Sequence, residues 1–186
     1  MVKTTDPAET PTRERILYAT AELFRRQGYS GTGLKQVVAE ADAPFGSLYH
    51  HFPGGKQQLA DEVIRGGGAF FQALVTAVYD EAATPGESVT AVFEGAAETL
   101  ASAASQVACP CATVALHVAS TIEQLRRATA EVFEQWTAAL TERLGDRDRA
   151  LAVIAALEGA FVLCRAERSV EPMLAAGRMA SAYVTG

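Results

Sequence analysis

The chain lacks the features that mark membrane-spanning, secreted and disulfide-bonded proteins. Its apolar runs are far shorter than the roughly 18 residues that a membrane-spanning helix needs, and residues 1–15 contain no apolar core of a signal peptide. Only three cysteines occur in 186 residues, an odd number that does not suit a disulfide framework: Cys109, Cys111 and Cys164. We therefore expect a cytoplasmic protein whose cysteines are buried thiols.

β-Structure and repeats are also scarce. Almost no segment alternates apolar and polar residues with a period of two, and aromatic residues make up only 8% of the chain. No internal repeat or low-complexity tract occurs. Alanine, leucine, glutamate and valine dominate instead, and 186 residues suffice for a well-buried core in one or two small domains. We expect an all-α fold.

Positive charge is scarce overall, but not in the N-terminal part. The formal net charge is −6, yet residues 1–56 hold seven Lys/Arg and six Asp/Glu, a net charge of +1, whereas residues 57–186 hold nine and sixteen, a net charge of −7. Phosphate neutralisation is local, because charges are screened beyond roughly 10 Å at 0.1 M salt. The acidic total therefore does not exclude nucleic-acid binding.

Residues 28–56 carry the clearest functional pattern, two short helices separated by a tight turn. The first helix has a threonine able to cap it and one apolar face, formed by Thr32, Leu34, Val37, Val38 and Ala41. Pro44 restricts Ala43 away from helical dihedrals and suits the first turn of a second helix, which residues 53–55 (PGG) end. That second helix carries an apolar stripe of Phe45, Leu48, Tyr49 and Phe52. Its other faces carry residues that can approach bases and phosphates: Gly46, Ser47 and His50.

A preceding helix over residues 12–27 would cover the back of this pair. Thr12 is a candidate cap, Gly28 is a stop, and one side is apolar through Ile16, Ala19, Leu23 and Phe24. Two short helices alone bury too little surface to be stable, so we expect the three to form one small domain. The expected division is an N-terminal arm and helix-turn-helix domain at 1–56, and a second helical domain at 57–186.

Six further helices are expected, about nine in total. Their approximate ranges are 56–83, 87–106, 110–120, 122–144, 146–168 and 172–184. Three glycines at 66–68 interrupt the apolar stripe of the first of these and mark a point where a helix bends or lets another element pack closely. We expect a locally tolerated turn of helix there.

Residues 12–64 resemble the N-terminal domain of TetR-family transcriptional regulators. The family pattern is a glycine and an aromatic residue after the first helix, a threonine opening the second, small residues at the turn, then Gly-x-Leu-Tyr-x-His-Phe and a lysine. Here it is matched by Gly28-Tyr29, Thr32, Ala41-Asp42-Ala43, residues 46–52 (GSLYHHF) and Lys56. The Pro-Gly-Gly-Lys that follows Phe52, and the later Cys-Pro, also resemble the LmrA/YxaF-like branch.

The resemblance implies a repressor that binds a pseudo-palindromic operator in double-stranded DNA as a homodimer and is released by a small hydrophobic or cationic effector. No cofactor and no membrane are implied. It places Thr32, Tyr49, His50 and Lys56 near phosphates and Phe45, Gly46 and Ser47 in the major groove, and Lys35 is a further expected DNA-binding residue. Two residues depart from the pattern: Pro44 stands where a Ser or Thr cap is usual, and Phe45 where a polar residue is common. Phe45 either touches a thymine methyl, packs beside Tyr49 or lies exposed.

For residues 57–186 the resemblance implies ligand binding and dimerisation. The two C-terminal helices, about 146–168 and 172–184, are the expected dimer elements, since Ala155, Ala156, Gly159 and Ala160 let a partner helix approach closely. Candidate pocket residues are large or polar side chains on expected inner faces: Phe70, Phe71, Leu74, Phe93, Cys109, Val114, His117, Trp136, Glu158, Phe161 and Arg165. A buried carboxylate needs a partner, so we predict that Glu158 forms an ordinary ion pair with Arg165 or His117, or else meets a cationic ligand.

Other kinds of site fit the sequence less well. Cys109, Cys111 and His117 are soft-metal ligand types, but no second cluster accompanies them, so we expect no metal. The two cysteines are either core thiols or sensors of electrophiles. An enzyme is disfavoured, because none of the three histidines has a glutamate three positions before it, as a di-iron helical bundle requires. A DNA-binding protein without an effector remains the alternative.

Overall fold

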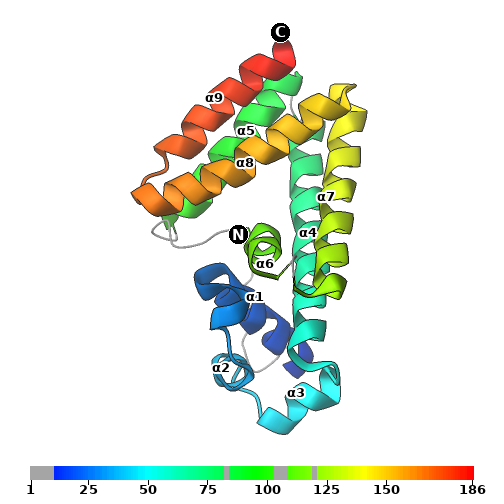
Figure 1. The fold of residues 1–186 in the computed structure, drawn as a ribbon. Coiled ribbons are helices and arrows are strands. Elements are labelled where there is room, and N and C mark those ends of the chain that lie inside the picture. The colour runs from blue at the N-terminus through cyan, green and yellow to red at the C-terminus, as the bar shows by residue number, and fades with distance from the viewer. Residues whose placement is uncertain (1–10, 82–83, 103–108, 119–120) are drawn as a thin grey trace.

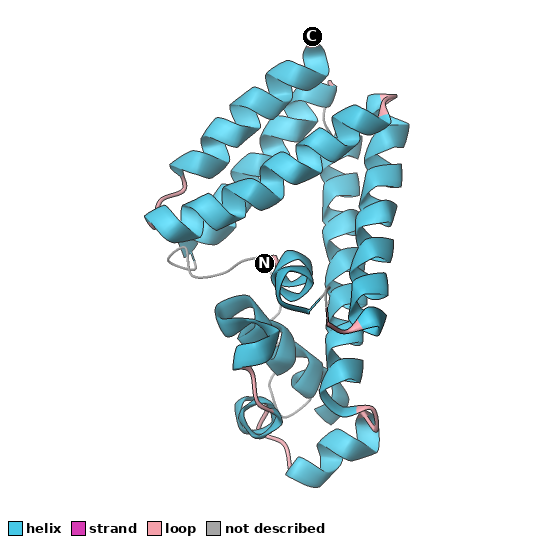
Figure 2. Ribbon diagram, viewed as in Figure 1, coloured by secondary structure: helices cyan, strands magenta, loops and turns pink. Residues whose placement is uncertain are grey.

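The computed structural model describes residues 11–81, 84–102, 109–118 and 121–186, and these form helices without a strand (Figures 1 and 2). The all-α expectation is confirmed. Within these ranges the nine helices are α1 (Thr12–Gly31), α2 (Leu34–Glu40), α3 (Phe45–His51), α4 (Gly55–Glu81), α5 (Pro85–Ser102), α6 (Pro110–Val118), α7 (Glu123–Leu144), α8 (Arg147–Glu167) and α9 (Glu171–Thr185).

Helices α1–α3 form one end of the molecule, which we call the head together with the first turns of α4. The rest, called the body, holds two groups of helices (Figure 1). The long helices α4 and α7 run side by side, while α5, α8 and α9 pack together at the far end. The short helix α6 packs on α1 and also contacts α4 and α7. The head therefore contacts the body through α6 as well as through the continuous helix α4.

Two separate apolar cores underlie these parts. The head core consists of Ile16, Ala19, Leu23, Val37, Val38, Ala41, Leu48, Phe52 and Leu59. The body core is larger and includes Phe24, Ala60, Ile64, Phe93, Val114, Trp136 and Met173. Helix α1 contributes to both, because Ile16 and Leu23 face the head core and Phe24 the body core. Leu59 and Ala60 divide α4 in the same way.

No side-chain cap precedes α1, α2 or α3. Pro11 precedes α1 and Gly33 precedes α2, and neither helix start has a side-chain cap. The prediction that Thr12 and Thr32 act as caps is therefore wrong. Thr12 is the first residue of α1, and the Thr32 hydroxyl donates instead to the Gly28 carbonyl, 2.8 Å away.

Glycines end or bend helices where the sequence indicates. Gly28 has φ of 75° and ψ of 174°, a conformation that non-glycine residues rarely adopt, and it breaks the regular part of α1 before a last turn to Gly31. Gly145 follows α7 in the left-handed region, at φ of 70°. The expected helix ends at residues 82–83, 103–106 and 119–120 lie outside the described residues.

The three glycines of α4 do not interrupt the helix. Gly68 allows α7 to approach closely, since a Cβ there would lie 2.5 Å from Cγ1 of Val132, whereas a Cβ at Gly66 would meet no heavy atom within 4 Å. The Trp136 indole donates to the Gly68 carbonyl at 2.9 Å. Gly68 thus fixes the contact between the two long helices. No helix within the described ranges is long and apolar enough to cross a membrane.

Candidate nucleic-acid interface and effector region

Helix α3 rests on the head core through one face only. Leu48 and Phe52 are fully buried, whereas Phe45 is 43% and Tyr49 is 49% exposed. Of the four residues of the apolar stripe, only Leu48 and Phe52 therefore enter the core, because a seven-residue helix on the surface of the head buries only one side. Their rings contact each other edge to face, with centroids 5.7 Å apart. Phe45 both packs beside Tyr49 and lies exposed.

The other residues of α3 that are predicted to approach bases or phosphates are Gly46, Ser47 and His50, and they lie outside the buried face of the helix. Gly46 and His50 are exposed, and a Cβ at Gly46 would meet no heavy atom within 4 Å. Ser47 is half-buried, and its backbone N–H donates to the Pro44 carbonyl at 3.0 Å. Pro44 is the residue before the helix rather than its first member, so its carbonyl replaces the missing Ser or Thr cap. Nothing on the described part of the chain covers Gly46.

Two lysines lie on the helices that precede and follow α3. Lys35 is exposed on α2, and Lys56 stands in the first turn of α4. The Lys56 ammonium lies 4.3 Å from the ring centroid of Tyr29, and partial burial lowers the pKa of Lys56. Tyr29 carries the family resemblance, but sequence reasoning gave it no role at the site.

Thr32 differs from the other predicted phosphate contacts because it is only 2% exposed. Its hydroxyl donates to the carbonyl of Gly28, and its backbone N–H donates to the carbonyl of Tyr29 at 3.2 Å. In this structure Thr32 supports the bend that follows the regular part of α1. Its contact with phosphate stays a prediction.

Arg15 holds the turn between α2 and α3, a role that sequence reasoning missed. Its guanidinium donates from Nε to the Ala41 carbonyl and from Nη2 to the Asp42 carbonyl, both at 3.0 Å. Asp42 is one of two described non-glycine residues with positive φ, at 46°. Arg15 thereby stabilises an unfavourable backbone turn. An arginine among the polar residues of a helix gives no pattern that signals such a long-range contact.

The predicted pocket residues are not gathered around one cavity. Phe93, Val114 and Trp136 are buried members of the body core. Phe93 fills the contact between α5 and α9, since a Cβ at Gly177 would lie 2.7 Å from its own Cβ. The Phe71 ring packs on Trp136 with centroids 4.5 Å apart. These large side chains take part in the packing of helix pairs, and their contact with a ligand stays a prediction.

Two predicted pocket residues instead contact the head. The Arg165 guanidinium of α8 donates to the Arg26 carbonyl at 2.7 Å. The His117 ring of α6 lies against Gly28, where an added Cβ would be 3.0 Å from Cε1, and its Nδ1 lies 2.7 Å from the Thr113 carbonyl. Because both side chains are engaged there, the predicted ion pair of Glu158 with Arg165 or His117 is not formed.

Glu158 has an unusual environment within α8. Its residue as a whole is half-buried together with Phe161, but its Oε2 atom is buried and has no hydrogen-bond partner among the described residues. Burial, reinforced by Cys109, raises the pKa of Glu158 well above its usual range. The Cys111 thiol, followed by burial, raises the pKa of Cys109. The Cys111 thiol contacts the Ile64 carbonyl of α4 at 3.5 Å.

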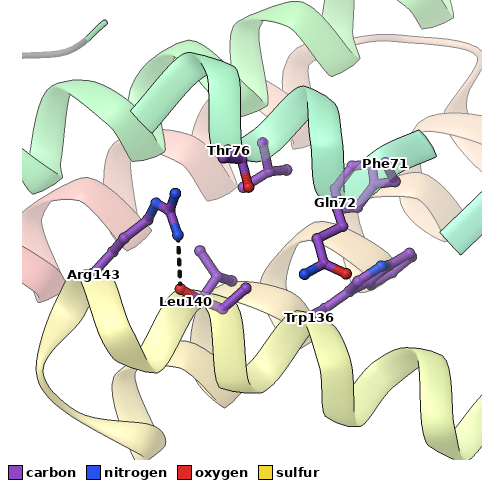
Figure 3. Close-up of a pocket in the computed structure, with 8 residues that line it drawn as sticks. Phe71, Gln72, Thr76, Trp136, Leu140 and Arg143 are labelled. Carbon is purple, nitrogen blue, oxygen red and sulfur yellow. Dashed lines mark hydrogen bonds between the residues drawn. The ribbon is translucent and has the colours of Figure 1, made fainter. Parts of the chain in front are cut away.

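A shallow pocket lies between α4 and α7 (Figure 3). It holds about 260 Å³, part of it open to solvent, and its lining is mostly apolar: Phe71, Gln72, Val75, Thr76, Trp136, Ala139, Leu140 and Arg143. The prediction identified Phe71 and Trp136 but missed the polar members. Phe70 and Leu74 point elsewhere and are 73% and 53% exposed. No group of three or more His, Cys, Asp or Glu side chains within the described ranges is placed to hold a metal ion.

The architecture is that of a helix-turn-helix regulator, a three-helix head joined to a helical body. Residues 16–63 match the family model of bacterial regulatory proteins of the tetR family, and residues 85–179 match the model of the LmrA/YxaF-like transcriptional regulator C-terminal domain. The chain belongs to the TetR family of transcriptional regulators, in its LmrA/YxaF-like branch.

Relatives and a solved structure agree with this assignment. The HTH-type transcriptional regulator LmrA of Bacillus subtilis is 31% identical over 170 residues, which cover 87% of this chain and 90% of the relative. The uncharacterised regulator YxaF of the same organism is 36% identical over 132 residues, 71% and 69% of the two chains. A regulatory protein TetR from Rhodobacter sphaeroides has the same fold, with a TM-score of 0.86 at 18% identity over 94% of this chain and 99% of that one.

Proposed function

We propose that the protein is a repressor that acts in the cytoplasm, binds a pseudo-palindromic operator as a homodimer, and is released by a small hydrophobic or cationic effector. The observation that carries this proposal is the uncovered face of α3. Leu48 and Phe52 anchor the helix, and Phe45, Gly46, Tyr49 and His50 project from it. A short helix with an exposed, glycine-containing side suits insertion into a major groove.

Phosphate contacts are proposed around this face. Lys35, Tyr49, His50 and Lys56 offer ammonium, phenol and imidazole groups that would fix the register of the head on the duplex without reading sequence. Thr32 belongs to the same proposed set, with the hydroxyl that this structure engages on Gly28. Base readout would fall to Phe45, Gly46 and Ser47.

Homodimer formation is supported by the apolar side chains that α8 and α9 leave exposed. They are Leu151, Val162 and Leu163 on α8, and Met179 and Tyr183 on α9. Exposed apolar residues on two helices that pack together suit an association surface, and a twofold axis there would place two α3 helices on successive half-sites. Leu163→Asp should therefore give a folded monomer by sedimentation analysis, whereas Leu116→Asp, at a 77% exposed position on α6, should remain dimeric.

Effector release is supported by the body rather than by a preformed cavity. Phe70 and Leu74 expose apolar surface on α4, and the unpartnered Oε2 of Glu158 would accept a hydrogen bond from a cationic group. An effector that binds better when the two heads are misplaced would shift the population away from the DNA-competent dimer.

Operator binding is tested by a gel shift with the DNA upstream of the protein's own coding region. We expect a saturable complex that survives non-specific competitor DNA at moderate salt and that Leu163→Asp weakens. If the wild-type protein forms no such complex on that DNA, the repressor proposal fails.

A DNA-binding protein without an effector is the second candidate, and the shallow pocket favours it. The space between α4 and α7 is shallow and partly open to solvent, whereas ligand pockets are clefts or cavities that bury most of a ligand's surface. Thermal shift with hydrophobic and cationic compounds, repeated in the presence of operator DNA, separates the two. A compound that stabilises the free protein and displaces DNA supports the regulated repressor, and its absence from a broad library supports the second candidate.

A further inference from the structure

Tyr29 lies where the body meets the part of the head that carries Lys56. On one side its ring packs on Phe24, with centroids 5.6 Å apart and planes inclined by 54°. On the other side the Lys56 ammonium lies 4.3 Å from the Tyr29 ring centroid. Phe24 is fully buried and belongs to the body core. A short series of contacts thus joins the body core to Lys56.

The contact with Tyr29 limits where the Lys56 ammonium can lie without neutralising it. A lysine on a free surface samples many rotamers, and ordering it against a phosphate costs side-chain entropy. The face of an aromatic ring attracts the ammonium and so restricts those rotamers beforehand. A carboxylate at position 29 would hold the lysine equally well but would cancel the charge that a phosphate needs. A ring leaves the full charge available.

The backbone under Tyr29 is fixed from both parts of the molecule. Within the head, Thr32 donates to the carbonyls of Gly28 and Tyr29. From the body, the His117 ring covers Gly28, and Arg165 donates to the Arg26 carbonyl. Glycine is the residue type that suits position 28, because φ there is 75° and a side chain would meet His117.

We propose that Tyr29 is a positioning residue for DNA binding: its ring holds the Lys56 ammonium in place to meet a phosphate, and the body sets its position through Phe24 and His117. This inference rests on the proposed function, since the contact of Lys56 with a phosphate is part of it. A displacement of α6 or of Phe24 would move Tyr29 and weaken the anchor on DNA. The body would then act on the head at Gly28 and Tyr29 as well as through α4.

The experiment is a double-mutant cycle on operator affinity, measured by fluorescence anisotropy at several salt concentrations. Lys56→Ala should weaken binding and lower the salt slope by about 0.9 for each phosphate that the protein no longer neutralises. Tyr29→Leu should weaken binding by about two- to tenfold in the wild-type background and cause no further loss in the Lys56→Ala background. Tyr29→Phe keeps the ring and should restore affinity to within about twofold of the wild type.

His117→Ala tests the part played by the body, with Leu116→Ala on the same helix as its control. We expect His117→Ala to weaken operator binding, again only when Lys56 is present, and Leu116→Ala to leave it unchanged. Equal losses from Tyr29→Leu with and without Lys56, or a Tyr29→Phe variant as weak as Tyr29→Leu, would overturn the positioning role. An unchanged His117→Ala variant would overturn the role of the body.

A measurement without DNA separates this inference from the proposed function. By NMR, the ε-methylene protons of Lys56 should show an upfield ring-current shift in the wild type and in Tyr29→Phe, which Tyr29→Leu removes. Absence of that shift in the wild type contradicts the inference even if the operator is bound. A normal shift together with no operator binding by any form contradicts the proposed function, and with it the role of Tyr29 on DNA.

Discussion

The head and the body share helix α1 but use their side chains differently. Among the described residues, the head core has nine buried apolar members and the body core twenty-five. The head exposes the aromatic residues Phe45 and Tyr49 on α3, whereas the body buries Phe93 and Trp136 and exposes mainly aliphatic residues on α8 and α9. A small core leaves many side chains free to contact a partner, so the proposed reading residues of the head lie on its surface. A large core uses its large side chains for packing.

Helix α1 shows how closely the two parts depend on each other. Leu23 is buried in the head core, and its neighbour Phe24 is buried in the body core. Because consecutive residues on a helix project about 100° apart, one helix can close both cores. On the side that faces α6, the apolar surface of the head is therefore buried by the body and not by the head itself.

The largest expected effect on stability comes from removing one large buried side chain from either core. Phe52→Ala in the head and Phe93→Ala in the body each remove a fully or almost fully buried ring, and each should lower the free energy of unfolding by about 3–5 kcal/mol. Urea denaturation followed by circular dichroism measures both losses. Amide hydrogen exchange distinguishes the two, since Phe52→Ala should accelerate exchange in α2 and α3 far more than in α8. Uniform acceleration in both variants would mean that head and body open as one unit.

Arg15→Ala tests whether the turn between α2 and α3 depends on the hydrogen bonds of the Arg15 guanidinium. The variant removes two charge-assisted hydrogen bonds to the carbonyls of Ala41 and Asp42, and should cost about 1–3 kcal/mol. Operator affinity should fall as well, because the angle between α2 and α3 is no longer fixed. Arg126→Ala provides a control, because this exposed arginine of α7 pairs with the exposed Glu123, and its loss should change stability little. If both arginine variants lose the same free energy of unfolding in denaturation, the hydrogen bonds of Arg15 do not stabilise the turn.

Glu158→Gln probes the buried carboxyl of the body through pH. The folded protein holds the Glu158 proton more tightly than the unfolded chain, because the pKa of Glu158 is raised above the ordinary value of 4.5. Its stabilising contribution is thus complete below pH 4.5 and is lost as pH rises toward the raised pKa. At pH 7 the glutamine variant should melt a few degrees above the wild type, and the advantage should shrink toward pH 4. Glu94→Gln, at an exposed position of α5, should show no such trend. A difference in melting temperature between Glu158→Gln and the wild type that stays constant across this pH range would contradict the raised pKa of Glu158.

The smallest effect on stability is expected from Gly46→Ala on the reading face. No heavy atom lies within 4 Å of the added Cβ, and alanine favours a helix over glycine by about 0.5–1 kcal/mol, so stability should rise slightly. Operator affinity should fall if DNA approaches the backbone of α3 at this point. Differential scanning calorimetry and anisotropy report the two quantities separately. An unchanged operator affinity would contradict the proposed part of Gly46 in base readout.

Local patterns predicted the elements of this protein well because helices are set by residues close in sequence. The apolar face of α1, the stops at Gly28 and Gly145 and the break at Pro44 were all readable from spacing. The partners across elements were not. Nothing near Arg15 indicates Ala41, nothing near Glu158 indicates Cys109, and the pairing of Tyr29 with Lys56 joins residues 27 positions apart. Such contacts depend on how helices dock, which no single periodicity encodes.

The sequence by itself determined the all-helical fold, the helix-turn-helix and the family, because these depend on local propensity and on a motif confined to a few turns. Only the tertiary structure decided which large side chains pack and which remain free. Trp136 and Phe93 became packing residues, Phe45 and Tyr49 became surface, and His117 and Arg165 joined the body to the head. The reason is geometric: a helix has several faces, and the neighbours that dock on it determine which of them is buried.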